Sequence, residues 1–136
     1  MALLIDSTVL IGLERRGRDS AELPTAIADE DLAIAAITAS EILFGVQRAD
    51  SPQRRNKREA WVEDALARFP LLSFDLEAAR QYAKLWAELS ASGSVIGLHD
   101  LQVAATAIAH GYDVLTENVR DFGRVPSLIV RQPAWS

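Results

Sequence analysis

Apolar residues in this sequence fall either into short continuous runs or into longer stretches spaced three and four residues apart. The runs are typical of strands buried on both faces, and the spaced stretches are typical of helices with one buried face. Strands are predicted at residues 2–5, 32–37, 71–74, 113–116 and 127–131. Helices are predicted between them, at residues 9–13, 21–28, 38–46, 61–69, 76–89 and 100–110.

This order of elements predicts an α/β fold. Right-handed crossovers through the helices place successive strands parallel in one sheet and leave helices on both of its faces. We therefore expect a three-layer α/β/α sandwich with a short, mainly parallel central sheet. A chain of 136 residues fits one domain, covering residues 1–136.

Composition and charge restrict the cellular compartment and the binding partners that we expect for this protein. The chain has no cysteine, which excludes disulfides and thiolate metal sites and fits a reducing cytoplasm. The apolar run at residues 2–5 is too short for a signal peptide or a membrane span, so we expect a cytoplasmic protein with no membrane contact. The net charge of −5 argues against holding nucleic acid by charge alone, but it permits binding through metal ions or a local basic patch.

Residues 96–122 contain the most informative pattern. Asp100 opens an apolar helix, Gly111 ends it, a short strand follows, and Asn118 and Asp121 lie in the next turn. The unit therefore carries a carboxylate at the start of its helix and more oxygen ligands just after its strand. Because open α/β sheets bind ligands at the carboxyl ends of their strands, this is a candidate site.

Two further carboxylates belong to similar junctions. Asp6 follows the first predicted strand, and Glu41 lies at the start of the helix after the second. Each has a structural alternative: Asp6 suits a helix cap equally well, and Thr38 with Glu41 has the spacing of a capping box. Asp100 and Asp121 also suit a cap and a turn. Together, however, a parallel sheet brings all four acids to one edge.

Clustered carboxylates repel one another unless a cation lies among them. Oxygen ligands without cysteine favour Mg²⁺ or Mn²⁺ over Zn²⁺, and these ions bind phosphate oxygens well. Hydrolysis of a phosphodiester by metal-activated water, with a second ion stabilising the leaving oxygen, is the resulting hypothesis. His99 and His110 lie at opposite ends of one helix, so they do not form an acid–base pair, and a surface or packing role suits His99 better than substrate contact.

A basic segment and two aromatic stripes have open interpretations. Residues 48–58 are the most basic part of the chain and include Arg48, Arg54, Arg55 and Arg58. Such a run is usually a solvated helix face, and the alternative is a patch that contacts phosphates. The stripes around Trp61 and Trp86 are expected in the core, with contact to a partner as the less frequent case.

The motifs resemble those of PIN domains, and more closely those of the VapC toxins of bacterial toxin–antitoxin pairs. The matching segments are residues 4–11, 38–45 and 100–122. The resemblance implies that a catalytic metal site is formed by Asp6, Glu41, Asp100 and Asp121. It also implies assisting roles for Asn118, Thr116, Ser7 and Thr8. The family often has Thr followed by Ser or Asn after the first Asp, whereas here Ser7 precedes Thr8.

VapC toxins are Mg²⁺- or Mn²⁺-dependent ribonucleases that cut RNA, often tRNA or rRNA, and thereby inhibit translation. The resemblance therefore implies an RNA substrate, a neutralising VapB-type antitoxin and a homodimer, with operator DNA bound only through the antitoxin. By the same analogy, the helices around Trp61 and Trp86 are candidates for dimer or antitoxin contacts. The basic segment, with Arg48, Arg54, Arg55 and Arg58, is the candidate RNA contact.

Three other functions compete with this one. A PIN-like binding module without catalysis is the main alternative, although a lapsed site would be free to lose one of its acids. A phospho-acceptor receiver domain needs a Lys after its last conserved strand, which residues 116–118 do not supply. A phosphatase of the haloacid dehalogenase type needs a second acid two residues after the first, where this chain has Thr8.

Overall fold

The computed structural model describes residues 2–23, 27 and 29–135 of the chain. In these residues five strands form one sheet, and every neighbouring pair runs parallel in the order β3-β2-β1-β4-β5. The strands are β1 (Ala2–Ile5), β2 (Asp31–Ala35), β3 (Leu71–Leu72), β4 (Asp113–Leu115) and β5 (Val130–Arg131). The predicted parallel sheet is therefore confirmed, with β3 at the predicted edge.

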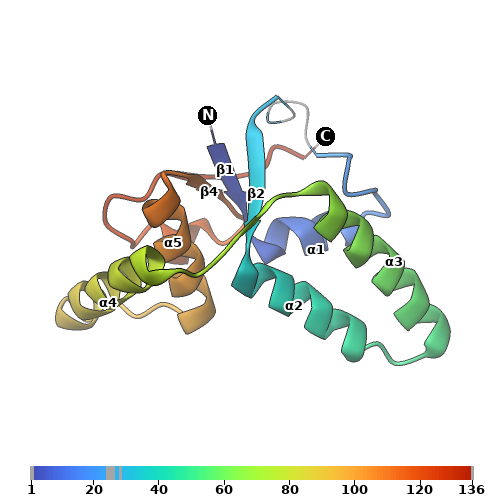
Figure 1. Cartoon of the computed structure of the whole chain (residues 1–136), viewed down its shortest axis with the longest axis horizontal. Coiled ribbons are helices and arrows are strands. Elements are labelled where there is room, and N and C mark those ends of the chain that lie inside the picture. The colour runs from blue at the N-terminus through green and yellow to red at the C-terminus, as the bar shows by residue number, and fades with distance from the viewer. Residues whose placement is uncertain (1, 24–26, 28, 136) are drawn as a thin grey trace.

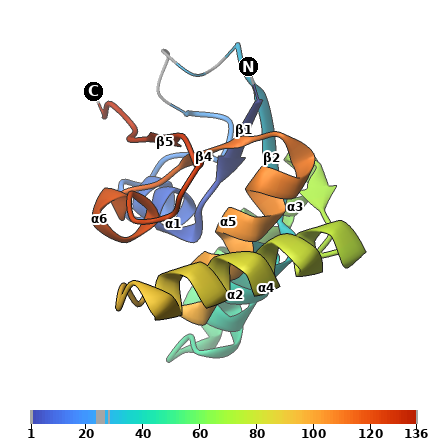
Figure 2. The same ribbon diagram turned by 90° about the vertical axis from the view of Figure 1, so that its left-hand side faces the viewer.

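Helices cover both faces of the sheet (Figure 1). They are α1 (Ser7–Arg15), α2 (Ala36–Gln47), α3 (Pro52–Arg68), α4 (Leu76–Ala91), α5 (Leu98–His110) and the short α6 (Val119–Phe122). In Figure 1, α2 and α3 lie to the right of the sheet and α4 and α5 to the left, and Figure 2 shows α4 crossing in front of α5. This arrangement is the α/β/α sandwich predicted from the order of elements.

Alternation along the strands divides the interior into two cores. Leu4 of β1 and Val114 of β4 point to one face, where they pack under α4 and α5. Leu3 and Ile5 of β1 point to the other face, where they pack under α1, α2 and α3. Because β1 is buried on both sides and lies at the centre of the sheet, the residue that follows it is fixed by both cores.

The helix that carries Glu41 begins earlier than predicted. Strand β2 ends at Ala35 and α2 begins at Ala36 with no connecting loop, so residue 37 is helical rather than extended. The predicted capping box of Thr38 and Glu41 is therefore wrong: Ala35 is at the cap position, and no side chain caps this helix. Glu41 lies in the second turn of α2, where it is free of the cap role.

Other boundaries were predicted with mixed success. Gly111 ends α5 with φ 75°, and Asp75 caps α4 by accepting from the Ala78 amide at 2.9 Å, both as predicted. Asp100, by contrast, is not a cap, because α5 begins at Leu98 after Gly97. The helix predicted at residues 61–69 begins at Pro52. The helix predicted at residues 21–28 lies partly outside the described residues.

Within the part of the chain that the structure describes, no helix combines the length and apolarity needed to cross a membrane.

Candidate active site

The four predicted acids converge where β1 and β4 end. Asp6 follows β1 directly, and Asp121 belongs to α6, just after β4. Asp100 projects from the first turn of α5 and Glu41 from the second turn of α2. Their charges act on one another: Asp6 raises the pKa of both Glu41 and Asp100, and Asp121 raises that of Asp100. The structure thus brings the four acids, from four separate elements, to one edge of the sheet.

Asp6 is the most buried of the acids, with 1% of its surface exposed. Its Oδ2 accepts hydrogen bonds from the hydroxyls of Thr8 and Thr116, each at 2.8 Å. These hydroxyls are in turn acceptors for backbone amides: Glu117 N donates to Thr8 Oγ1 at 3.1 Å and Asn118 N donates to Thr116 Oγ1 at 2.9 Å. The network fixes one carboxylate oxygen and leaves the other, Oδ1, buried without a hydrogen-bond partner among the described residues.

Asp100 and Asp121 share one donor. Asn118 Nδ2 donates to Asp100 Oδ2 at 3.1 Å and to Asp121 Oδ2 at 3.2 Å. Burial, followed by the charge of Asp6, raises the pKa of Asp100 from 3.8 to about 6, against the lowering effect of the Asn118 hydrogen bond. An amide therefore holds this pair together, and the Arg124 guanidinium, 3.6 Å from Asp121 Oδ1, also pairs with Asp121.

Glu41 completes the cluster from the opposite core. Ser7 Oγ donates to its Oε2 at a long 3.4 Å, and its Oε1 is buried with no partner in the described chain. Burial raises the pKa of Glu41 above 4.5, and the charges of Asp6 and Asp100 raise it further. Two acids, Asp6 and Glu41, thus each have one unpartnered oxygen.

His99 is nearer to the acids than the sequence analysis suggested. The residue is exposed, immediately precedes Asp100, and lowers the pKa of both Glu41 and Asp100 by its charge. It also lines the cavity described below together with Glu41. Its position next to Asp100 in the first turn of a helix was the sequence signal that could have identified it.

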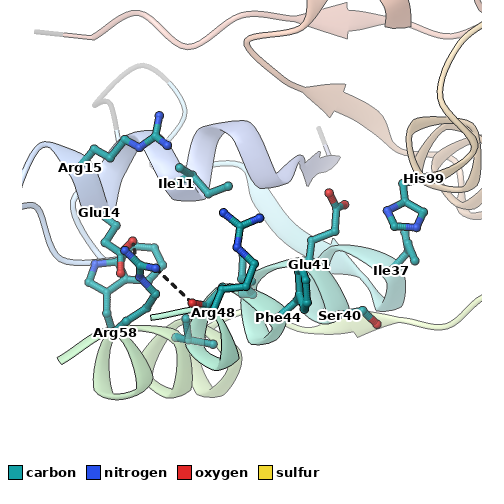
Figure 3. Close-up of a pocket in the computed structure, with 14 residues that line it drawn as sticks. Ile11, Glu14, Arg15, Ile37, Ser40, Glu41, Phe44, Arg48, Arg58 and His99 are labelled. Carbon is teal, nitrogen blue, oxygen red and sulfur yellow. Dashed lines mark hydrogen bonds and ion pairs between the residues drawn. The ribbon is translucent and has the colours of Figure 1, made fainter. Parts of the chain in front are cut away.

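A cavity of about 610 Å³ opens beside Glu41 between α1, α2 and α3. Figure 3 shows the side chains of Glu41 and Arg48 rising from α2 toward α1, with His99 beyond Glu41. Phe44 and Gly45 also line the cavity, and Figure 3 shows Arg15 and Arg58 on the side away from Glu41. The acid cluster therefore continues into a groove with both apolar and cationic walls.

The predicted basic segment does not form one patch. Arg48 and Arg58 line the groove, and Arg58 donates to the Gly45 carbonyl at 3.1 Å and lies 3.5 Å from Glu14. Arg54 instead pairs with Asp50 at 2.9 Å on the outer surface, and Arg55 is exposed on the first half of α3. The segment is divided because it spans the α2–α3 connection and then winds around a helix.

Of the two tryptophans, Trp61 lies in its predicted setting and Trp86 does not. Trp61 packs against the α1–α2–α3 core and donates from Nε1 to the Arg18 carbonyl at 2.8 Å, as expected of a core residue. Trp86 is 50% exposed, because the buried face of α4 is formed by Ala78, Leu85 and Leu89. It stacks edge-on with Tyr82, which in turn stacks on Phe74.

The C-terminal segment also reaches the site. Trp135 Nε1 donates to Glu117 Oε1 at 2.8 Å, and the Arg16 guanidinium lies 3.9 Å from the centre of the Trp135 ring. Since the Glu117 amide is bonded to Thr8, Trp135 anchors the turn that carries the Asp6 network. No pattern in the sequence predicted this contact.

The donor set suits a hard divalent cation. Within the described residues no three acidic or imidazole side chains are gathered closely enough to form a ready-made metal shell. However, Asp6 Oδ1 and Glu41 Oε1 have no hydrogen-bond partner among the described residues, and all nearby ligands except His99 are oxygens. Burial and neighbouring acids also raise the pKa values of Glu41 and Asp100. A cation would satisfy these oxygens and relieve the repulsion, so the residues fit Mg²⁺ or Mn²⁺.

The chain is similar in sequence and fold to several known proteins. A family model for the PIN domain matches residues 3–128. Ribonuclease VapC1 of Rickettsia felis is 38% identical over 130 residues, covering 96% of this chain and 95% of that protein. The tRNA(fMet)-specific endonuclease VapC of Salmonella typhimurium is 32% identical over 71% of each chain. A chain in the crystal structure of VapBC-5 from Mycobacterium tuberculosis, a toxin–antitoxin complex, superposes with a TM-score of 0.77 at 29% identity over 98% of each chain.

Proposed function

This chain belongs to the PIN-domain family, and we propose that it is a VapC-type toxin: an endoribonuclease that hydrolyses RNA phosphodiester bonds and inhibits translation. The observation that carries the proposal is the convergence of Asp6, Glu41, Asp100 and Asp121 on a fold shared with VapC ribonucleases. We place the activity in the cytoplasm, where tRNA and rRNA are found. The relative from Salmonella typhimurium is named for cleavage of tRNA(fMet), which makes tRNA the first substrate to test.

Four side chains would hold the metal ion. Asp6 and Glu41 would contribute the oxygens that have no other partner, and Asp100 and Asp121 would contribute from the α5 and α6 side. When bound, Mg²⁺ or Mn²⁺ supplies a nucleophilic water at neutral pH and neutralises charge on the phosphate.

The remaining site residues orient these acids. Thr8 and Thr116 hold Asp6 Oδ2, so that Oδ1 faces the cluster. Asn118 holds Asp100 and Asp121 next to each other, and Ser7 restrains Glu41. Such partners of ligating carboxylates set their direction, and their loss lowers metal affinity.

RNA would approach along the groove between α1, α2 and α3. A chain with a net charge of −5 and an acidic centre repels a polyanion, so local cations must offset the repulsion. Arg48 and Arg58 line the groove and are the best placed of the predicted contacts. Arg54 and Arg55 lie on the outer surface and would contact only RNA that extends beyond the groove.

A VapB-type antitoxin and a second copy of this chain are the proposed protein partners. The similarity to a chain of the VapBC-5 complex supports the first of these. The exposed aromatic cluster of Phe74, Tyr82 and Trp86 on the α4 side is a candidate surface for either partner. Operator DNA would be bound through the antitoxin only.

Cleavage by the partner-free protein tests the function. Purified protein would be incubated with total RNA and with purified tRNA in Mg²⁺, Mn²⁺ or EDTA. Discrete cuts that need the divalent ion are expected from the wild type, and Asp100→Ala should abolish them. Glu88→Gln, at an exposed acid on α4, is the control and should cleave normally. Cutting that persists in EDTA or in Asp100→Ala would refute the proposal, and absence of cutting by folded wild type would favour a non-catalytic binding module.

A further inference from the structure

Phe44 is an apolar side chain that the core does not use. It lies on α2, one turn after Glu41, and 59% of its surface is exposed, whereas Ile42 and Val46 of the same helix are buried. Packing therefore does not explain a large ring at this position. The ring lines the same groove as Glu41, next to the acid cluster.

Arg48 accompanies this ring. Its Cζ lies 5.5 Å from the centre of the Phe44 ring, within the range of a cation–π contact. Arg58, the neighbouring cation, is occupied by Glu14 and by the Gly45 carbonyl. Arg48 forms no ion pair within the described chain, so its charge remains available to a ligand. The two residues together present an aromatic face and a cation.

These two chemical groups match the two parts of a nucleotide. Bases of single-stranded RNA stack on aromatic side chains, and arginine binds the adjoining phosphate. A cavity of about 610 Å³ lies within the size range of small-ligand sites, and Glu41 at its end borders the place where the phosphodiester would be cut. The uncompensated cation favours a polyanion over an apolar peptide as the occupant of this groove.

We propose that Phe44 and Arg48 form a nucleotide platform that binds single-stranded RNA next to the scissile bond, with a base stacked on Phe44 and its phosphate on Arg48. The inference rests on the proposed ribonuclease function and identifies the residues that orient the RNA in the groove. Phe44 then determines specificity by contact with a base, a role that no charge pattern in the sequence indicated.

Binding and cleavage are measured separately, so that the two proposals can fail independently. A fluorescein-labelled, single-stranded 12-nucleotide RNA of mixed sequence would be titrated with protein in EDTA and followed by anisotropy. Phe44→Leu is expected to weaken binding about tenfold, the effect of losing one stacked base, and Phe44→Tyr should retain affinity. Leu43→Ala, on the same helix but outside the groove, is the matched control. Each variant would first be checked for an unchanged thermal melt.

The salt dependence separates stacking from charge. Arg48→Gln should reduce the slope of log affinity against log salt by about 0.7, the value for one phosphate contact on a single strand, whereas Phe44→Leu should leave the slope unchanged. Arg80→Gln, at an exposed cation on α4 and outside the groove, should change neither affinity nor slope for this RNA. In Mg²⁺, Phe44→Leu should raise KM with little change in kcat.

Several results would overturn the platform. One is that Phe44→Leu binds and cuts RNA like the wild type, and another is that Phe44→Tyr binds RNA as weakly as Phe44→Leu. Loss of antitoxin binding by Phe44→Leu, with RNA binding unchanged, would assign the groove to a peptide instead. If wild type binds the RNA through Phe44 but cuts no RNA in any metal, the platform stands and the ribonuclease proposal fails.

Discussion

The two sides of the acid cluster are held in different ways. Asp6 is fully buried after a central strand, and two threonine hydroxyls fix one of its oxygens at 2.8 Å. Asp100 and Glu41 are half-buried on helices, where a single amide and one long hydroxyl contact hold them. Burial and the neighbouring acids raise the pKa of both, that of Asp100 to about 6.

This difference indicates that Asp6 has one role in the site and that Asp100 and Glu41 have another. A carboxylate with fixed direction sets where a cation would lie, because its free oxygen cannot turn away. Carboxylates with raised pKa values and few hydrogen bonds can gain or lose a proton, and can change their orientation, when a cation or a phosphate binds. Four variants would test whether the fixed side and the adjustable side are truly unequal.

Removing the charge of the fixed acid should have the largest effect. In Asp6→Asn the side chain keeps its size but loses the negative charge that would face the cation. Cleavage should fall on the order of a thousandfold, corresponding to several kcal/mol of transition-state stabilisation. Single-turnover cleavage measures this, with Glu88→Gln on α4 as the control. Activity above a tenth of wild type would show that Asp6 does not anchor the site.

Removing the hydroxyls that fix Asp6 should have the next largest effect. Thr8→Val with Thr116→Val leaves Asp6 Oδ2 and the amides of Glu117 and Asn118 without their partners. Metal affinity should fall roughly 10- to 100-fold, as for other groups that orient a ligand. Calorimetric titration with Mn²⁺ measures it. The double variant Thr8→Ser with Thr116→Ser keeps both hydroxyls and should bind Mn²⁺ nearly as tightly as the wild type. If the Ser and Val double variants lose the same metal affinity, the effect is due to packing and not to the hydroxyls.

The raised pKa of Asp100, on the less restrained side of the cluster, should make the stability of the protein depend on pH. The folded-state pKa of Asp100 is raised from 3.8 to about 6, so folding binds a proton between these values and stability falls as pH rises through them. At pH 7 the ionised Asp100 destabilises the metal-free protein. Asp100→Asn should therefore be more stable at pH 7 by about 1 kcal/mol, a value reduced for the solvent-exposed part of the group.

Denaturant unfolding in EDTA at pH 5 and pH 7 would measure this effect. The gain should be smaller at pH 5, where the wild-type carboxyl is mostly protonated. Added Mn²⁺ should stabilise the wild type more than the variant. A variant less stable than wild type at pH 7 without metal would contradict the electrostatic account.

Asn118→Ala should have the smallest effect. Its amide favours the ionised form of Asp100, so its loss raises that pKa above about 6 and leaves more of the carboxyl protonated at pH 6. Cleavage should fall about threefold at pH 6 and less at pH 8, where Asp100 is ionised in either protein. A loss that is the same at both pH values would mean that Asn118 acts by position and not through the Asp100 proton.

The order of elements could be predicted from the sequence because burial determines it. The continuous apolar runs around Leu4 and Val114 are needed for strands covered on both faces, and Gly111 is needed for a left-handed helix end. The start of α2 could not be predicted in this way. Strand β2 passes into it without a loop, so that Thr38 and Glu41 imitate a cap that the helix does not use.

The gathering of the acids could be predicted in outline, since strand ends of a parallel sheet share an edge. How each acid is held could not, because it depends on contacts between distant segments, such as that between Thr116 and Asp6. The basic segment shows the same limit: Arg48 and Arg54 are close in sequence, yet one lines the groove and the other pairs with Asp50 outside it. The catalytic roles of these residues remain predictions for the variants above.

The pairing of the first strand with the fourth has a consequence for the time course of synthesis. The Asp6–Thr116 hydrogen bond joins residues 110 positions apart, and β1 finds its neighbour β4 only after most of the chain has been made. At about 5–20 residues per second, translation needs roughly 5 to 20 seconds to proceed from one partner to the other. A nascent chain therefore spends those seconds with an incomplete acid cluster, and a fragment that ends before β4 cannot assemble the site.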